Sequence, residues 1–173
     1  MNTRGIFVVF LMILLLLPCS AQEISRKERR KRIKLEKEAL IKELIHSREF
    51  VFTASRALPQ NGRSIDLTSN SNSIKFHPDR IESYMPFYGR AYQIDFNGEG
   101  GIKFEGKPTV FNIADKMRKG YEIKVVVPAA HENYQLNLFV SPDGSATLTI
   151  NSISRAFISY YGNIGKIEAL KEK

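Results

Sequence analysis

The stretch "YQLNLFVSPDGSATLTINS", residues 134–152, contains the pattern that decides the fold. Apolar and polar residues alternate through 134–140 and again through 146–152, which is the period of a half-buried β-strand. The "SPDG" between the two runs has the chemistry of a type I turn that ends in a left-handed residue. The stretch therefore predicts an antiparallel β-hairpin.

The same alternation recurs on both sides of this hairpin. It is absent from "HPDRIES" (77–83), which indicates a turn or a single helical turn, and "GNIG" (162–165) is expected to end the last run. About ten short strands are predicted in this way. They lie at 50–55, 65–67, 74–76, 92–96, 102–104, 109–117, 121–129, 134–140, 146–152 and 155–161.

The spacers between these strands indicate how the strands are connected. Few spacers are long enough for the crossover that joins two parallel strands. The predicted fold is therefore all-β, an antiparallel meander that closes as a barrel or folds as a two-sheet sandwich. Because the sequence has no internal repeat of fixed period, we expect one β domain over residues 48–165 and a polar tail over 166–173.

A charged segment at residues 22–47 predicts an N-terminal helix, from about Ser25 to His46. From residue 23 to 49 there is no Gly or Pro, and good helix formers dominate. The first half of the helix is almost entirely charged, whereas the second half has an apolar face that is expected to pack on the β domain. The apolar positions are Ile33, Leu40, Ile41, Leu44 and Ile45.

The first 21 residues are typical of a secretory signal peptide. Arg4 precedes an apolar run over 6–17, and small residues precede a cleavage site after Ala21. The mature chain is expected to begin at Gln22. One alternative is an uncleaved anchor helix; another is lipidation of Cys19, which the preceding proline disfavours. Cys19 is the only cysteine, so the mature chain would have no disulfide, cysteine nucleophile or thiolate metal site.

The charge of the chain is unevenly distributed. The formal net charge is +8, and much of it lies in the predicted helix, where seven cations fall within nine residues. Such a run binds polyanions by releasing counterions, and in an exported protein the expected polyanion is a membrane surface rather than nucleic acid. The alternative is a solvated spacer. The seven residues are Arg26, Lys27, Arg29, Arg30, Lys31, Arg32 and Lys34.

The stretch "YMPFYGRAY" (84–92) is expected to turn sharply rather than to form a plain strand. Pro86 restricts the residue before it to an extended conformation, and Gly89 is expected to adopt a backbone angle closed to its neighbours. If this stretch meets the C-terminal strand, tyrosines and arginines would line a region suited to an acidic or sugar-like ligand. The alternative is a polar–aromatic network that closes the sheet. The candidate ligand-binding residues are Tyr84, Tyr88, Arg90, Tyr92, Arg155, Tyr160 and Tyr161.

Motifs for catalysis and metal binding are missing from the sequence. There is no G-x-S-x-G elbow, and the three histidines, His46, His77 and His131, are not at ligand spacing. We therefore predict no catalytic residue, metal or cofactor. Two carboxylates from distant strands would suit a glycosidase. The acids nearest the aromatic stretch are Asp95, Glu99 and Glu105.

Five segments stand out together: "SREFVFTASRALPQNGRSIDLTS" (47–69), "YMPFYGRAYQ" (84–93), "GGIKF" (100–104), "YEIKV" (121–125) and "DGSATLTINSISRAFISYYGNI" (143–164). In this order and spacing they resemble an uncharacterised secreted family of Bacteroidetes, catalogued only as a domain of unknown function. The resemblance covers nearly the whole mature chain. It implies an exported protein of a Gram-negative envelope, periplasmic or associated with the outer membrane. It does not identify a reaction, a ligand or a catalytic residue.

The sequence favours a non-enzymatic envelope module that binds a small ligand or an envelope protein through its aromatic and arginine residues. Two alternatives stay open: a hydrolase of envelope or dietary glycans, and a structural envelope component that contacts the membrane through the basic helix. A pocket with two carboxylates at catalytic separation would favour the hydrolase. A pocket lined by Tyr and Arg would favour binding, and a closed, filled core would favour the structural role.

Overall fold

A computed structural model describes residues 25–60, 62–69, 72–92, 101–129 and 132–167. In this part of the chain it has one α-helix, one short 3-10 helix and ten β-strands. The chain forms two compact units, Met1–Arg32 and Ile33–Lys173. The elements are α2 (Arg26–Ser47), β1 (Phe50–Pro59), β2 (Ile65–Asp66), β3 (Ser73–Phe76), β4 (Ile81–Met85), β5 (Ile102–Gly106), β6 (Val110–Asp115), η1 (Met117–Lys119), β7 (Tyr121–Pro128), β8 (Asn133–Val140), β9 (Ser145–Asn151) and β10 (Ile158–Gly165).

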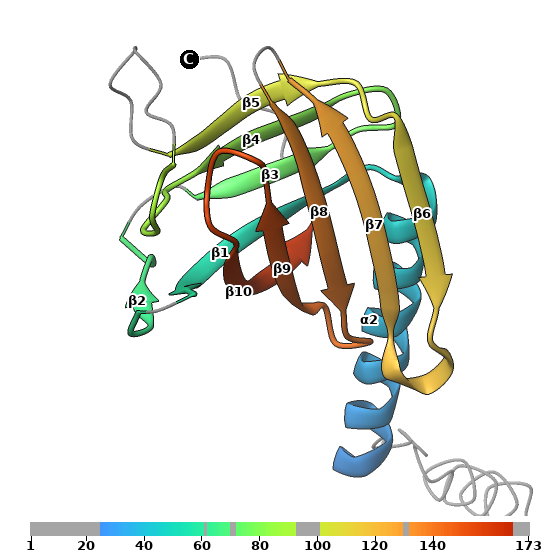
Figure 1. The fold of residues 1–173 in the computed structure, drawn as a ribbon. Coiled ribbons are helices and arrows are strands. Elements are labelled where there is room, and N and C mark those ends of the chain that lie inside the picture. Colours follow the sequence, from blue (N-terminus) through green and yellow to red (C-terminus); the bar gives the residue numbers. More distant parts are fainter. Residues whose placement is uncertain (1–24, 61, 70–71, 93–100, 130–131, 168–173) are drawn as a thin grey trace, which may run out of the picture. The chain divides into compact units, whose positions relative to one another are not determined.

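The strands form one antiparallel sheet with the order β5-β4-β3-β1-β10-β9-β8-β7-β6, and β2 pairs with β1 alone (Figure 1). The first and last strands thus pair in the middle of the sheet, and its two edges are β5 and β6. The sheet curls into a half-barrel, so that Phe104 on β5 stacks on Tyr134 of β8 with ring centres 4.3 Å apart. The predicted all-β antiparallel fold with one N-terminal helix is confirmed.

The hairpin of β8 and β9 follows the sequence pattern closely. Every second residue of both strands is buried. Gly144 has φ of 84°, and its N–H donates to the carbonyl of Ser141 at 2.9 Å. The Asp143 carboxylate accepts hydrogen bonds from the backbone N–H and the hydroxyl of Ser145. The predicted turn is therefore confirmed, because the left-handed position is filled by glycine.

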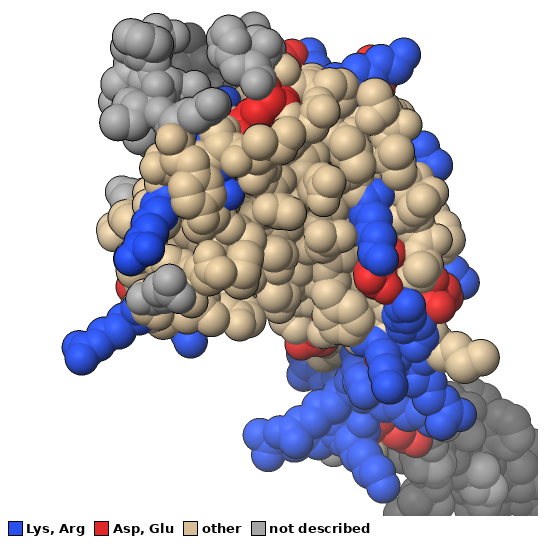
Figure 2. Space-filling view, in the orientation of Figure 1, with Lys and Arg blue, Asp and Glu red and all other residues tan. Residues whose placement is uncertain are grey.

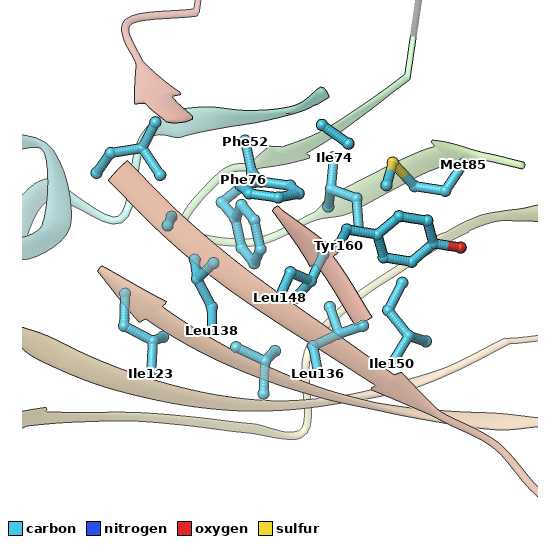
Figure 3. Close-up of a cluster of buried hydrophobic side chains, with 14 of the residues drawn as sticks. Phe52, Ile74, Phe76, Met85, Ile123, Leu136, Leu138, Leu148, Ile150 and Tyr160 are labelled. Carbon is cyan, nitrogen blue, oxygen red and sulfur yellow. The ribbon is translucent and has the colours of Figure 1, made fainter. Parts of the chain in front are cut away.

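Inward-facing residues of eight strands build a single apolar core, and Phe111 and Ile113 of β6 and Ile65 of β2 pack against it (Figure 3). Phe50 and Phe76, on neighbouring strands, stack with ring centres 4.6 Å apart. Tyr160 lies among these side chains with its hydroxyl oxygen at the margin of the cluster (Figure 3). Without a disulfide among the described residues, burial of this apolar surface is the main stabilising term.

Helix α2 begins with a capping box and ends against the sheet. The backbone N–H of Glu28 donates to the Ser25 hydroxyl, and the Glu28 carboxylate accepts from the Ser25 N–H. Ile41, Leu44 and Ile45 are buried in the core, which confirms that the second half of the helix docks. No described helix has an apolar stretch long enough to cross a membrane.

The apolar face of α2 is shorter than the sequence predicted. Ile33 was expected on the docked face together with Leu40, yet 54% of its surface is exposed, whereas Leu40 is partly buried against the core. The expectation for Ile33 is therefore wrong. Leu40 packs against the core and Ile41 is the first residue of the helix within it, so the helix contributes to the core only in its last two turns.

The strand β4 corrects the expected turn at residues 77–83. Ile81, Ser83 and Met85 alternate inward, so residues 81–83 are extended rather than part of a turn. The Ser83 hydroxyl donates to the carbonyl of Ile102 at 2.8 Å, which makes its burial tolerable. A polar side chain at an inward position concealed the alternation.

The last strand is also shifted relative to its prediction. It begins at Ile158 rather than Arg155 and continues through "GNIG" (162–165), which was expected to end it. Gly162 faces a bulge in β1, and a Cβ there would lie 2.0 Å from the carbonyl oxygen of Thr53. Glycine is present because two backbones approach closely, not because the strand stops. The strand expected at 92–96 lies, except for Tyr92, outside the described residues.

Candidate functional site

The aromatic stretch leaves the sheet after β4 and pairs with a segment from the other end of the chain. The N–H of Tyr92 donates to the carbonyl of Ser154 at 2.7 Å, and the N–H of Ala156 donates to the carbonyl of Arg90 at 3.0 Å. These bonds form one antiparallel bridge, outside the named strands. The expected departure from a plain strand is confirmed, and the structure brings the two segments together.

Gly89 has a different role from the one the sequence suggested. Its φ is not positive, whereas Gly101, Gly120 and Gly144 do have positive values. A Cβ at Gly89 would lie 2.5 Å from Cζ of the Phe87 ring. The expectation of a special backbone angle is wrong: Gly89 leaves room for the ring of Phe87.

A cavity of about 380 Å³ opens beside this bridge. Its size lies within the range of small-molecule sites. Tyr88 and Tyr92 have 42% and 68% of their surfaces exposed, and Arg90 is exposed as well. The residues that line it include Pro59, Gln60, Tyr88, Arg90, Tyr92 and Ala156. Three of the seven predicted ligand-binding residues therefore share one cavity, which we call the Tyr88–Tyr92 cavity.

Tyr160 has a structural position in the core. Its side chain is fully buried, and its hydroxyl donates to the carbonyl of Pro86 at 2.6 Å. Burial raises the pKa of Tyr160 well above the ordinary value of 10.0, and the nearby Tyr88 adds to this rise. The residue anchors the start of the turn to β10, and its hydroxyl is already engaged within the protein.

Arg155 lies in a second buried cluster, centred on Glu132. The Glu132 carboxylate accepts hydrogen bonds from the hydroxyls of Ser154 and Tyr134, and one of its oxygens is 3.8 Å from Nε of Arg155. The Nη1 atom of Arg155 donates a hydrogen bond to the carbonyl oxygen of Gly101. The two side chains are 9% and 10% exposed, so the pair is well shielded from solvent. This cluster holds Ser154 and Arg155 in place. The Tyr88–Tyr92 cavity depends on this segment, because Tyr92 is hydrogen-bonded to the carbonyl of Ser154.

Glu132 is charged in this cluster although its side chain is only 9% exposed. Burial alone raises the pKa of its carboxyl. Hydrogen bonds from Ser154, Tyr134 and Ser152, together with the positive charge of Arg155, outweigh burial and bring the pKa below its ordinary value of 4.5. Sequence reasoning missed Glu132, because a single acid in a loop 23 residues before Arg155 carries no periodic signal.

The remaining two predicted residues lie apart from the Tyr88–Tyr92 cavity. Tyr84 is 58% exposed on β4, with the Lys103 ammonium 4.8 Å from its ring centre, and it borders a separate cavity of about 370 Å³. Tyr161 is 41% exposed, and it follows the buried Tyr160 on β10. A strand directs successive side chains to opposite faces, so the two neighbouring tyrosines cannot line the same site.

The described part of the chain offers no set of side chains that commonly binds a metal ion. No group of three or more His, Cys, Asp and Glu residues that could hold a metal ion occurs there. His46 instead packs edge-on against Tyr121, with ring centres 6.0 Å apart. His131, Asp95, Glu99 and Cys19 lie outside the described residues.

All seven predicted polyanion-binding residues lie in the first half of α2 and are exposed. Lys34 forms an ion pair with Glu38 at 3.8 Å, and 76% of its side chain remains exposed. None of the buried residues of the helix precedes Ile41. This half of the helix therefore presents its charge to solvent.

Comparison with known proteins relates this geometry to one family. A search of the curated proteins found no match. A solved structure, the crystal structure of a DUF4251 family protein from Bacteroides eggerthii DSM 20697 at 1.95 Å resolution, matches with a TM-score of 0.62 and 20% sequence identity. The match covers 76% of this chain and 88% of that chain, and at this identity it shows a shared fold.

The sequence gives the family directly. Residues 33–164 match the family model described as Domain of unknown function (DUF4251), which is more than half of the chain. The matched region begins within α2 and ends in β10. The resemblance to a Bacteroidetes family of unknown function is confirmed by both comparisons. This chain belongs to the DUF4251 family.

Proposed function

We propose that this protein is a non-enzymatic binding module of the bacterial cell envelope and that it takes an acidic, sugar-like ligand in the Tyr88–Tyr92 cavity. The observation that carries the proposal is the meeting of two exposed tyrosines and one exposed arginine around a cavity of about 380 Å³. Tyrosine rings stack on the apolar faces of sugar rings, and a guanidinium recognises a carboxylate through two parallel hydrogen bonds.

The backbone around the cavity supports binding without rearrangement. Arg90 and Tyr92 are each bonded through their backbones to the segment 154–156, and Tyr160 holds Pro86 at the start of the turn. Residues that are already ordered lose little conformational entropy when a ligand binds. These bonds support the proposal because they hold the backbone of the cavity lining in place before any ligand binds.

The hydrolase alternative receives less support from the structure. The other cavity, of about 370 Å³, is lined by Glu82 and Glu105, which lie opposite each other on β4 and β5. Arg80 is ion-paired with both carboxylates, at 2.8 Å and 3.5 Å, and Lys75 lies 3.6 Å from Glu82. A glycosidase needs one of its two carboxyl groups to act as a proton donor. Two carboxylates that share one guanidinium are better suited to holding β4 and β5 together.

The binding proposal is tested by thermal unfolding and calorimetry with an oligosaccharide of glucuronic acid, compared with the matching neutral oligosaccharide of glucose. We expect the acidic sugar to raise the unfolding temperature of the full chain. Arg90→Gln is expected to weaken its affinity by about 10-fold to 100-fold, because a charge-assisted hydrogen bond is lost.

Arg118→Gln is the matched control, since Arg118 is an exposed arginine on η1, away from the cavity residues. It is expected to keep the wild-type affinity. Absence of any stabilisation by the acidic sugar in the folded protein would contradict the ligand class. An equal loss in both variants would contradict the assignment of the cavity.

Export is part of the same proposal and rests on the signal-like pattern of residues 1–21, which lie outside the described part of the chain. When the gene is expressed with this segment in a Gram-negative host, mass spectrometry of the envelope fraction is expected to find a chain that begins at Gln22. A chain that begins at Met1 would contradict cleavage. A lipid-modified chain that begins at Cys19 would instead show an anchored protein.

A further inference from the structure

The first half of α2 carries a dense positive charge that the β domain does not use. We call residues 26–35 the basic segment; it holds seven cations and one acid, Glu28, so its net charge is 7 − 1 = +6. Every residue of the basic segment is exposed, and Lys and Arg side chains crowd this part of the helix (Figure 2). A charged stretch without buried residues adds no apolar surface to the core, and its side chains face the solvent.

We infer that the basic segment binds the anionic headgroups of a membrane surface. The helix itself is well formed at this point, because Ser25 and Glu28 cap it through two mutual hydrogen bonds. The single acid of the segment is thereby engaged in the cap. Headgroup phosphates would be attracted to the cations, and each Lys or Arg near an anionic bilayer strengthens binding about fivefold.

The distribution of the cations favours a surface that adapts to the helix. Successive residues of an α-helix are about 100° apart, so a run such as Arg29–Arg32 surrounds the axis almost completely. A folded protein partner would recognise one face of the helix and leave the other cations unused. Lipid headgroups are mobile within the bilayer, so they can gather around cations on any side of the helix that faces the membrane.

Two exposed apolar side chains in the basic segment favour a membrane over other polyanions as the partner. Ile33 and Leu35 lie among the cations, and 54% and 55% of their surfaces are exposed. Two positions apart, they lie about 200° apart around the helix, so a bilayer that meets either of these two sides of the helix meets one of them. The boundary between headgroups and acyl chains buries such side chains, whereas a nucleic-acid backbone offers them only phosphates and sugars.

The experiment measures binding of the full chain to vesicles of phosphatidylcholine alone and of phosphatidylcholine mixed with phosphatidylglycerol. The charge variant Lys27→Gln/Arg29→Gln/Arg30→Gln/Lys31→Gln keeps good helix formers in place. Because it removes four cations, it is expected to lose on the order of 600-fold in affinity for the mixed vesicles. Residues 1–24 are identical in every variant, so any binding through them contributes equally to the wild type and to each variant.

The matched control removes the same charge elsewhere, from exposed residues of the β domain: Arg63→Gln/Lys107→Gln/Arg118→Gln/Lys119→Gln. It is expected to bind the mixed vesicles like the wild type. Ile33→Gln/Leu35→Gln is expected to bind several-fold more weakly than the wild type. Circular dichroism is used to check that each variant retains its fold.

The vesicle experiment tests membrane binding by the basic segment independently of ligand binding in the Tyr88–Tyr92 cavity. Wild-type binding that requires phosphatidylglycerol, weakens with salt and is lost only in the charge variant supports it. Equal binding by the charge variant and the wild type overturns it. It is also overturned if a short nucleic-acid duplex binds more tightly than the mixed vesicles and Ile33→Gln/Leu35→Gln has no effect on either.

Discussion

Replacing Gly162 with alanine is expected to lower the free energy of unfolding by about 4 kcal/mol. The added Cβ would lie 2.0 Å from the carbonyl oxygen of Thr53 and 2.9 Å from Cα of Ala54. Both are backbone atoms of β1, so no side-chain rotation relieves the clash. Because β1 and β10 pair in the middle of the sheet, relief requires the two central strands to separate. Urea unfolding followed by circular dichroism measures the change.

Gly165→Ala is the matched control on the same strand. A Cβ at Gly165 meets nothing within 4 Å, so the free energy of unfolding is expected to change by less than about 0.5 kcal/mol. Similar stabilities of the two variants would show that β1 and β10 do not approach as closely as the structure indicates. The comparison therefore tests the pairing that joins the two halves of the sheet.

Replacing Glu132 with glutamine is expected to cost about 3 kcal/mol of stability. The substitution keeps the size of the side chain, removes its negative charge and replaces one of its two accepting oxygens, to which Tyr134 and Ser154 donate, with an NH2 donor. It leaves the guanidinium of Arg155, which is 10% exposed, without the carboxylate that lies 3.8 Å from its Nε. Equilibrium unfolding in urea at neutral pH measures the loss, and hydrogen exchange of the Tyr92 amide reports whether the cavity rim loosens.

Two further variants separate the buried charge from general effects. Glu105→Gln removes an exposed acid, 62% accessible and 3.5 Å from Arg80, and is expected to cost less than about 1 kcal/mol. Glu132→Gln combined with Arg155→Met removes both buried charges and is expected to recover most of the stability lost in the single variant. If the single and double variants are equally destabilised, charge pairing is not the reason for the loss.

The pH dependence gives a second readout for Glu132. Because the pKa of its carboxyl is lowered below 4.5 in the folded protein, its stabilising contribution is complete above that pH and disappears as the pH falls through the folded value. The difference in stability between the wild type and Glu132→Gln is therefore expected to shrink in acid. A difference that stays constant down to low pH would contradict the charged state of Glu132.

Local sequence pattern predicted those strands in which the inward positions are apolar. β8 and β9 follow the alternation that defined them, and their turn is fixed by a left-handed glycine at Gly144. The pattern failed where an inward residue is polar, as Ser83 is in β4, or where a glycine serves a close approach, as Gly162 does in β10. In both cases the deciding contact comes from another strand.

The candidate site was predicted only in part. The tyrosines and arginines were recognisable as a group, and the structure places Tyr88, Arg90 and Tyr92 around one cavity. Tyr160 and Arg155 instead hold that region from within the protein, through Pro86 and Glu132. Residue type alone does not distinguish a side chain that lines a cavity from one that supports it, because the two differ only in which neighbours they meet.

The sequence by itself determined the fold class, the helix, the family and the concentration of charge in the basic segment. These follow from patterns between residues near one another in the chain, since strand and helix periods are local properties. Only the tertiary structure decided which aromatic residues are exposed, where the cavity lies and which acid meets Arg155. Such contacts join residues far apart in the chain, as Tyr92 and Ser154 show, and they depend on strand pairing that local periodicity does not encode.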